Sequence, residues 1–139
     1  MDNLGSLYLS FTGRINRQPW WLSLLALVVA ECIIFAILGA IMGPGVASVD
    51  PNDPAAGMAA VSRITIPAAI VGLIVLYPTL AIYTKRWHDR GKSGWWTLII
   101  LVPIIGGIWA LVELGFLKGT PGANKYGPDP LDARAVAAA

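Results

Sequence analysis

The hydrophobic pattern divides the chain into three long apolar stretches separated by polar segments. The stretches cover residues 20–42, 64–84 and 95–117, and their only charged residues are Glu31 and Glu113. A bilayer core of about 30 Å is crossed by roughly 20 helical residues, which matches each stretch. Three buried helices of this length in one short soluble chain would be unusual. We therefore predict three transmembrane helices.

A short amphipathic helix is predicted before the first stretch, within residues 1–13. Apolar side chains recur there at the spacing of one helical face: Leu4, Leu7, Tyr8 and Phe11. We expect this helix to lie in the membrane interface and to end at Gly13. Asn16 is then placed to cap the first span.

Turn-forming and polar residues connect these elements. Residues 43–63 contain three prolines and two aspartates, residues 85–94 are strongly basic, and the tail from 118 is rich in Gly and Pro. The predicted fold is an all-α integral membrane protein with three transmembrane helices and an interfacial amino-terminal helix. We expect one membrane domain over residues 1–130 and a poorly ordered Ala-rich tail over residues 131–139.

Composition supports a bilayer environment. Hydrophobic residues make up 56% of the 139 residues and charged residues 13%, against about 45–50% and about 25% in globular proteins. The net charge of +2 is too small to indicate nucleic-acid binding. With Cys32 as the single cysteine and one histidine, the chain can form neither an internal disulfide nor a conventional zinc site. We predict no metal and no cofactor.

The distribution of Lys and Arg predicts the orientation. With three spans, the amino-terminal flank and the 85–94 loop share one side and carry six positive residues, against four on the other side. The positive-inside rule then places the amino terminus and the 85–94 loop in the cytoplasm and the tail outside.

A second topology has stronger support from charge alone. Pro103 and the pair Gly106 and Gly107 could break the third stretch into a re-entrant hairpin that returns the tail to the cytoplasm. The cytoplasmic side would then carry nine positive residues and the other side one. Irregular backbone at membrane depth must however be buried in protein or face water. Three full spans therefore remain the preferred topology, with the hairpin as the alternative.

The basic loop is the strongest candidate for binding. Cations beside a helix amino terminus favour anions, so we predict a site for lipid headgroups or an acidic partner. Its residues would be Arg14, Arg17, Lys85, Arg86, Arg90 and Lys92. Aromatic residues at the ends of spans are predicted to anchor the chain at the interface, namely Trp20, Trp21, Trp95 and Trp96. The alternative is that the loop only sets the topology.

Two catalytic interpretations of this loop are disfavoured. Gly91-Lys92-Ser93 resembles the end of a P-loop, but the position that needs the first glycine holds Arg86. His88 and Asp89 are adjacent, and adjacent residues on a helix do not face each other. We expect Asp89 to pair with an arginine of the same loop. No catalytic residue is predicted.

The two intramembrane acids suggest different roles. Glu31 lies about 16 Å along the helix from Trp20, near the bilayer centre, where a charge is costly. It either relays protons or cations, or remains protonated in a helix contact. Glu113 lies close to the end of its stretch, where it can reach the interface.

Three blocks of residues resemble a known family. They are Phe11-x-Gly13-Arg14-x-x-Arg17-x-x-Trp20-Trp21, Arg86-Trp87-His88-Asp89-Arg90-Gly91-Lys92-Ser93-Gly94-Trp95-Trp96, and Gly119-Thr120-Pro121-Gly122-x-Asn124-Lys125-Tyr126-Gly127-Pro128-Asp129-Pro130. In this order they resemble the small bacterial YhaH-like inner-membrane family of unknown function, with Trp87 where that family has Leu. The resemblance implies a multi-pass bacterial inner-membrane protein and leaves the function open.

These observations favour a non-enzymatic, homo-oligomeric scaffold or adaptor of the bacterial inner membrane. Its basic cytoplasmic site would bind anionic lipid headgroups or a protein partner. The alternative is an oligomeric channel or permease subunit that uses Glu31, and a membrane-embedded enzyme is the third possibility.

Overall fold

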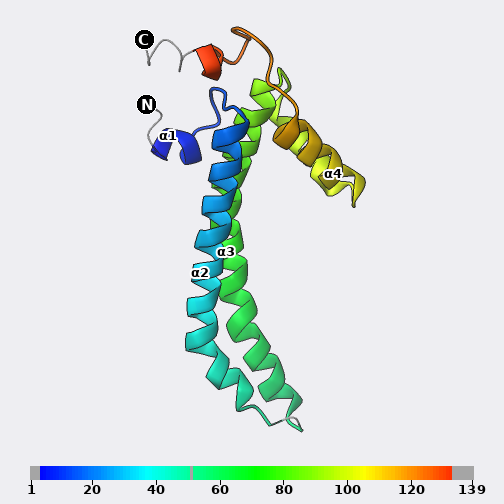
Figure 1. The fold of residues 1–139 in the computed structure, drawn as a ribbon. Helices are drawn as coiled ribbons and strands as arrows, with labels where there is room; N and C mark the ends of the chain where they lie inside the picture. The colour runs from blue at the N-terminus through cyan, green and yellow to red at the C-terminus, as the bar shows by residue number, and fades with distance from the viewer. Residues whose placement is uncertain (1–3, 51, 133–139) are drawn as a thin grey trace. The chain divides into compact units, whose positions relative to one another are not determined.

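The computed structural model describes residues 4–50 and 52–132, and every regular element in these ranges is helical. The elements are α1 (Leu4–Leu9), α2 (Arg17–Ala47), α3 (Pro54–Asp89), the 3₁₀ helix η1 (Gly94–Leu101), α4 (Ile105–Leu111) and the π-helical η2 (Val112–Phe116) (Figure 1). The predicted all-α class is confirmed. Two compact units divide the chain. We call the described residues of one, 4–25 and 77–132, the head and those of the other, 26–76 without 51, the stem.

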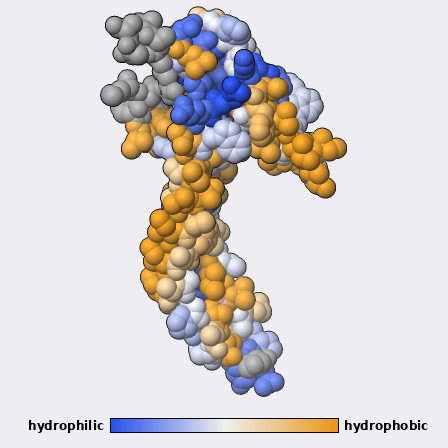
Figure 2. Space-filling view, viewed as in Figure 1, coloured by the Kyte–Doolittle hydropathy of each residue, from blue (hydrophilic) through white to orange (hydrophobic). Residues whose placement is uncertain are grey.

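Two helices are long and apolar enough to cross a membrane. α2 has 31 residues and α3 has 36, which correspond to about 46 and about 54 Å at 1.5 Å per residue. Their apolar stretches are almost entirely unburied within the protein, and hydrophobic surface covers much of the stem in Figure 2. Aliphatic side chains such as Ile41 and Leu73 are 69% exposed. Apolar surface of this extent is expected where lipid replaces water.

Both long helices begin with side-chain caps. Asn16 accepts a hydrogen bond from the backbone N–H of Gln18 at 3.1 Å, so the predicted cap of the first span is confirmed. The Asp53 carboxylate accepts from Ala55 and Ala56, each at 3.0 Å, at the start of α3. These caps satisfy backbone donors that have no partner within their own helix.

The third apolar stretch is not one continuous helix. It forms η1, a turn at 102–104, α4 and η2. Pro103 cannot donate to a helical ladder and disfavours helical geometry in the residue before it. Gly106 then lies so close to the carbonyl of Ile99 that an added Cβ would overlap it. The count of three spans is therefore not confirmed.

The amino-terminal helix is shorter than predicted. α1 ends at Leu9 rather than at Gly13. The Lys85 ammonium donates to the carbonyls of Ser6 and Leu7, and the hydroxyl of Tyr77 donates to Leu9 at 3.1 Å. These bonds satisfy the last carbonyls of α1 and attach the helix to α3. Its predicted amphipathic, interfacial character is not confirmed, and residues 1–3 lie outside the described ranges.

Candidate functional site

The carboxylate of Asp89 lies at the centre of a buried ion-pair network in the head. Asp89 is the last residue of α3, and its side chain is 2% exposed. One carboxylate oxygen accepts from Arg14 and the other from Arg86. A buried carboxylate is stable only when it is paired and hydrogen-bonded. The expected pairing of Asp89 with an arginine of its own segment is confirmed by Arg86.

Arg14 joins three parts of the head. Its Nε and Nη2 atoms lie 3.2 and 3.1 Å from Oδ1 of Asp89. Nη2 also donates to the carbonyl of Thr120 at 2.7 Å, and Nη1 donates to those of Gly122 and Gly127 at 2.7 and 3.3 Å. The guanidinium therefore binds α3 and two turns of the tail at once. Arginine suits this role because its donors have a fixed planar arrangement.

Arg86 makes a second set of buried bonds. Its side chain has no exposed surface, and it donates to the carbonyls of Leu114 and Leu117 at 2.7 and 2.6 Å. It also donates to Ile15 at 3.4 Å. The carbonyls of Leu114 and Leu117 lie at the end of η2, and that of Ile15 lies just before α2. Arg86 therefore satisfies backbone acceptors at a helix end, where partners within the helix are lacking. The Arg86 guanidinium thus donates to a carboxylate and to backbone carbonyls of the protein itself.

The tail is bound directly to the end of α3. The backbone N–H and the hydroxyl of Thr120 donate to the carbonyl of Asp89 at 2.8 and 3.0 Å. Asn124 donates to the carbonyl of His88 at 2.9 Å, and the ring of Tyr126 stacks on His88 with centroids 3.7 Å apart. At Gly119 an added Cβ would overlap the Asp89 carboxylate. This approach requires glycine.

Glu113 forms a second ion-pair cluster with the basic loop. Arg90 donates to its carboxylate at 2.9 Å, and Lys92 donates to its other oxygen. Glu113 thus has two specific partners in the basic loop. Its extension to the interface stays a prediction.

The six predicted headgroup-binding cations have different environments. Arg14, Lys85 and Arg86 are buried, and Arg90 and Lys92 are paired with Glu113. Arg17 is exposed and donates through Nη1 to the carbonyl of Phe116 at 2.9 Å. The structure thus brings all six into the head and gives each of them at least one partner within the protein.

The four predicted aromatic anchors also differ. Trp20 is 1% exposed and packs edge-on against Trp21 and Tyr83 in the core of the head. It has no surface with which to contact a headgroup. Trp21, Trp95 and Trp96 are 42%, 78% and 43% exposed. Trp96 also receives a cation–π contact from Lys92 at 5.2 Å.

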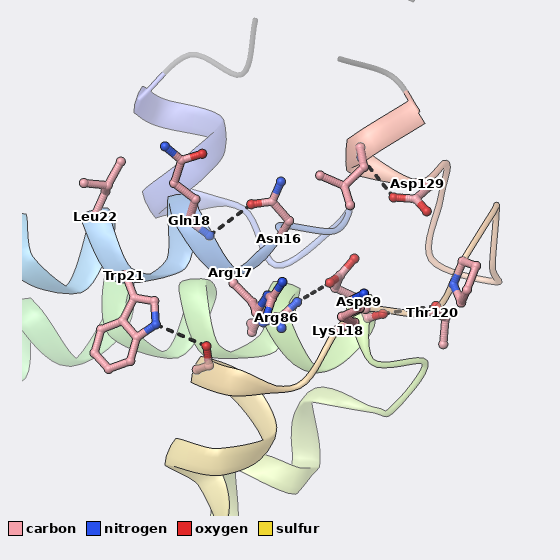
Figure 3. Close-up of a pocket in the computed structure, with 14 residues that line it drawn as sticks. Asn16, Arg17, Gln18, Trp21, Leu22, Arg86, Asp89, Lys118, Thr120 and Asp129 are labelled. Atoms are coloured by element: carbon pink, nitrogen blue, oxygen red, sulfur yellow. Dashed lines mark hydrogen bonds and ion pairs between the residues drawn. The ribbon is translucent and has the colours of Figure 1, made fainter. Parts of the chain in front are cut away.

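A pocket of about 740 Å³ lies beside the network. Figure 3 shows its lining side chains coming from the start of α2, the end of α3 and the segment after η2. Polar lining is provided by Asn16, Arg17, Gln18, Arg86, Asp89, Lys118, Thr120 and Asp129, and apolar lining by Trp21, Leu22, Pro121 and Leu131. Its volume is in the range of small-molecule sites, about 300–1,000 Å³.

Glu31 lies in the stem, away from these clusters in the sequence. Its residue is partly exposed in α2, and within residues 4–50 and 52–132 its carboxylate has no hydrogen-bond or ion-pair partner. The described residues also contain no cluster of His, Cys, Asp or Glu that could hold a metal ion.

Sequence reasoning missed the long-range part of the network. Arg14 and Asp89 are 75 positions apart, and their pairing follows from the meeting of α2 and α3 in the head. One available signal was the concentration of charge, Gly and Pro in three blocks. The blocks that carry the family resemblance are those that meet at Asp89.

Comparisons with known proteins identify the family. A family of proteins of unknown function (DUF805) matches residues 8–128. The chain belongs to this family. It is 32% identical to inner membrane protein YhaH of Escherichia coli (strain K12) over 123 residues, covering 88% of each chain. It is also 32% identical to inner membrane protein YhaI of the same strain, covering 88% of this chain and 87% of that protein.

A more distant relative has no assigned role. The uncharacterized protein YiiR of Escherichia coli (strain K12) is 27% identical, with 90% of this chain and 88% of that protein covered. No solved structure matches this chain significantly. Together with the two long apolar helices, the DUF805 relatives identify a bacterial inner-membrane protein. The family does not assign it a function.

Proposed function

We propose that this DUF805 protein is a non-enzymatic scaffold or adaptor whose head presents a basic surface to anionic lipid headgroups. The observation that carries the proposal is the closed network at Asp89, in which buried charges hold three remote segments together. Exposed cations remain outside this network, namely Arg17, Lys118 and Lys125. The buried charges thus support the head, and the exposed ones are available for an anionic surface.

The proposal includes a topology with the amino terminus, the 85–94 loop and the tail together in the cytoplasm. It is supported by the hydrogen bonds between Thr120 and Asp89, because a full span over residues 95–117 would place these two residues on opposite sides. Nine of the ten Lys and Arg residues then lie on the cytoplasmic side, and Arg63 is the exception.

The third stretch would enter the membrane as a re-entrant hairpin. Backbone at membrane depth needs hydrogen-bond partners. At the turn, Val102 donates to Ile99 at 2.9 Å and Gly106 donates to Val102 at 3.0 Å. Ile105 and Ile108 also donate to nearby carbonyls, at 2.7 and 3.1 Å. These bonds lower the cost of placing the turn in an apolar environment.

Lipid-dependent thermal unfolding tests the binding role. The full-length protein in a neutral detergent would be mixed with phosphatidylglycerol or with phosphatidylcholine, at low and high salt. We expect phosphatidylglycerol to raise the unfolding temperature more, and salt to reduce the difference because it screens exposed charges. Equal stabilisation by the two lipids at low salt would contradict the proposal.

A further inference from the structure

We propose that the pocket between the start of α2 and the tail binds the phosphate headgroup of a single anionic phospholipid. The inference deepens the proposed function and rests on it. It replaces a diffuse basic surface by one site with a defined ligand class. The pocket is the 740 Å³ cavity of Figure 3.

Two cations that line this pocket have donors to spare. Arg17 uses Nη1 for the carbonyl of Phe116, and within the described residues its Nε and Nη2 atoms have no partner. In the same part of the chain the Lys118 ammonium makes no hydrogen bond or ion pair, and this residue is exposed. A guanidinium and an ammonium from opposite ends of the sequence are a suitable pair for phosphate oxygens.

The acidic residues of the pocket are already satisfied. Asp89 is neutralised by Arg14 and Arg86. Asp129 accepts from the backbone N–H groups of Gly122 and Leu131 at 3.0 and 2.9 Å. Three cations line the pocket against these two carboxylates. The excess charge is positive and resides on Arg17 and Lys118, which keep donors without an acceptor within the described residues.

The apolar lining indicates a lipid rather than a soluble anion. Trp21 and Leu22 belong to the start of the first apolar stretch, one turn after Arg17. Leu22 is 57% exposed. The pocket therefore lies where the chain changes from polar to apolar, which is the level of headgroups in a bilayer. A phosphate at Arg17 and Lys118 would leave an acyl chain beside the apolar lining that begins at Trp21 and includes Leu22.

Native mass spectrometry of the full-length protein in detergent tests this assignment. The probes are phosphatidylglycerol, phosphatidylcholine and soluble glycerol 3-phosphate. We expect one retained phosphatidylglycerol in the wild type. The double variant Arg17→Gln and Lys118→Gln should bind it about 30-fold more weakly, because each cation near an anionic surface contributes about fivefold.

Two control proteins make the result specific. The single variants Arg17→Gln and Arg63→Gln remove the same charge. Arg63 is exposed and does not line the pocket, so Arg63→Gln should bind phosphatidylglycerol as the wild type does. Leu22→Ser should weaken phosphatidylglycerol binding without changing any weak binding of glycerol 3-phosphate. Unfolding temperatures near that of the wild type would show that each variant is folded.

The outcomes separate the pocket from the wider proposal. Equal retention by Arg17→Gln and its charge-matched control Arg63→Gln would overturn the pocket while leaving salt-dependent binding to the head intact. Glycerol 3-phosphate bound as tightly as phosphatidylglycerol would overturn the lipid assignment. A wild type that does not prefer phosphatidylglycerol over phosphatidylcholine would overturn both the pocket and the proposed function.

Discussion

Thr120 donates from both its backbone N–H and its hydroxyl to the carbonyl of Asp89, at 2.8 and 3.0 Å. This contact attaches the tail to the last residue of α3. We therefore expect the tail to lie on the same side of the membrane as the 85–94 loop. The topology of the third apolar stretch can therefore be tested through the tail.

Reporter fusions test the topology. We expect fusions after residue 92 and after residue 130 to report the cytoplasm, because Thr120 and Asp89 are in contact, and a fusion after residue 52 to report the periplasm. An alkaline phosphatase and a fluorescent-protein reporter would be compared at each position. A periplasmic tail together with a cytoplasmic 85–94 loop would restore the three-span topology and contradict the hairpin.

The adjacent glycines of the third stretch offer a matched pair of substitutions. Gly106→Ala should disrupt the turn, because its Cβ would overlap the carbonyl of Ile99, whereas a Cβ at Gly107 meets nothing within 4 Å. We expect Gly106→Ala to lower the unfolding temperature and to increase proteolysis of the tail. Gly107→Ala should behave as the wild type. Similar behaviour of the two variants would show that this close approach does not support the turn.

Substitution of Asp89 tests the buried network. Asp89→Asn leaves Arg14 and Arg86 buried without a counter-charge, and breaking a buried pair in this way costs about 3–5 kcal/mol. We expect the head to unfold at a lower temperature, measured by the fluorescence of its tryptophans. Asp132→Asn, at an exposed position, is the control. Unchanged unfolding of Asp89→Asn would mean that the network contributes little to the head.

The elements that sequence predicts well are those determined by local pattern. Two apolar stretches and the cap at Asn16 follow from hydropathy and capping rules. The break in the third stretch depends on how closely Gly106 approaches Ile99, which composition cannot reveal. The sequence indicated that Pro103 could break the helix, but prolines are also common in membrane helices.

The sequence predicts which residues belong to the candidate site, but it does not predict which of them contact one another. The sequence identified Arg14, Arg86 and Arg90 as a basic group, and predicted a pair for Asp89. It could not show that Arg14 lies against Asp89 and the tail, because that contact requires the two helices to meet. The sequence places Glu113 only by its depth, whereas its partners come from a loop about twenty residues earlier.

Substitution of Glu113 tests the second ion-pair cluster. Glu113→Gln keeps the size of the side chain but removes the charge that pairs with Arg90 and Lys92. We expect the unfolding temperature of the head to fall, because two partly buried cations lose their counter-charge. An unchanged unfolding temperature would show that this cluster contributes little to the head.

Glu31 distinguishes the scaffold from the channel alternative. It is partly exposed in α2 and has no partner within the described residues, so a second helix or water would have to satisfy it. Glu31→Gln keeps the size and hydrogen-bonding capacity but cannot titrate near neutral pH. For a scaffold, we expect proton and cation flux across reconstituted vesicles to be equally low in both proteins, with the same oligomer size. If wild-type vesicles conduct and the variant's do not, at equal assembly, Glu31 lines a pathway and the channel alternative replaces the scaffold.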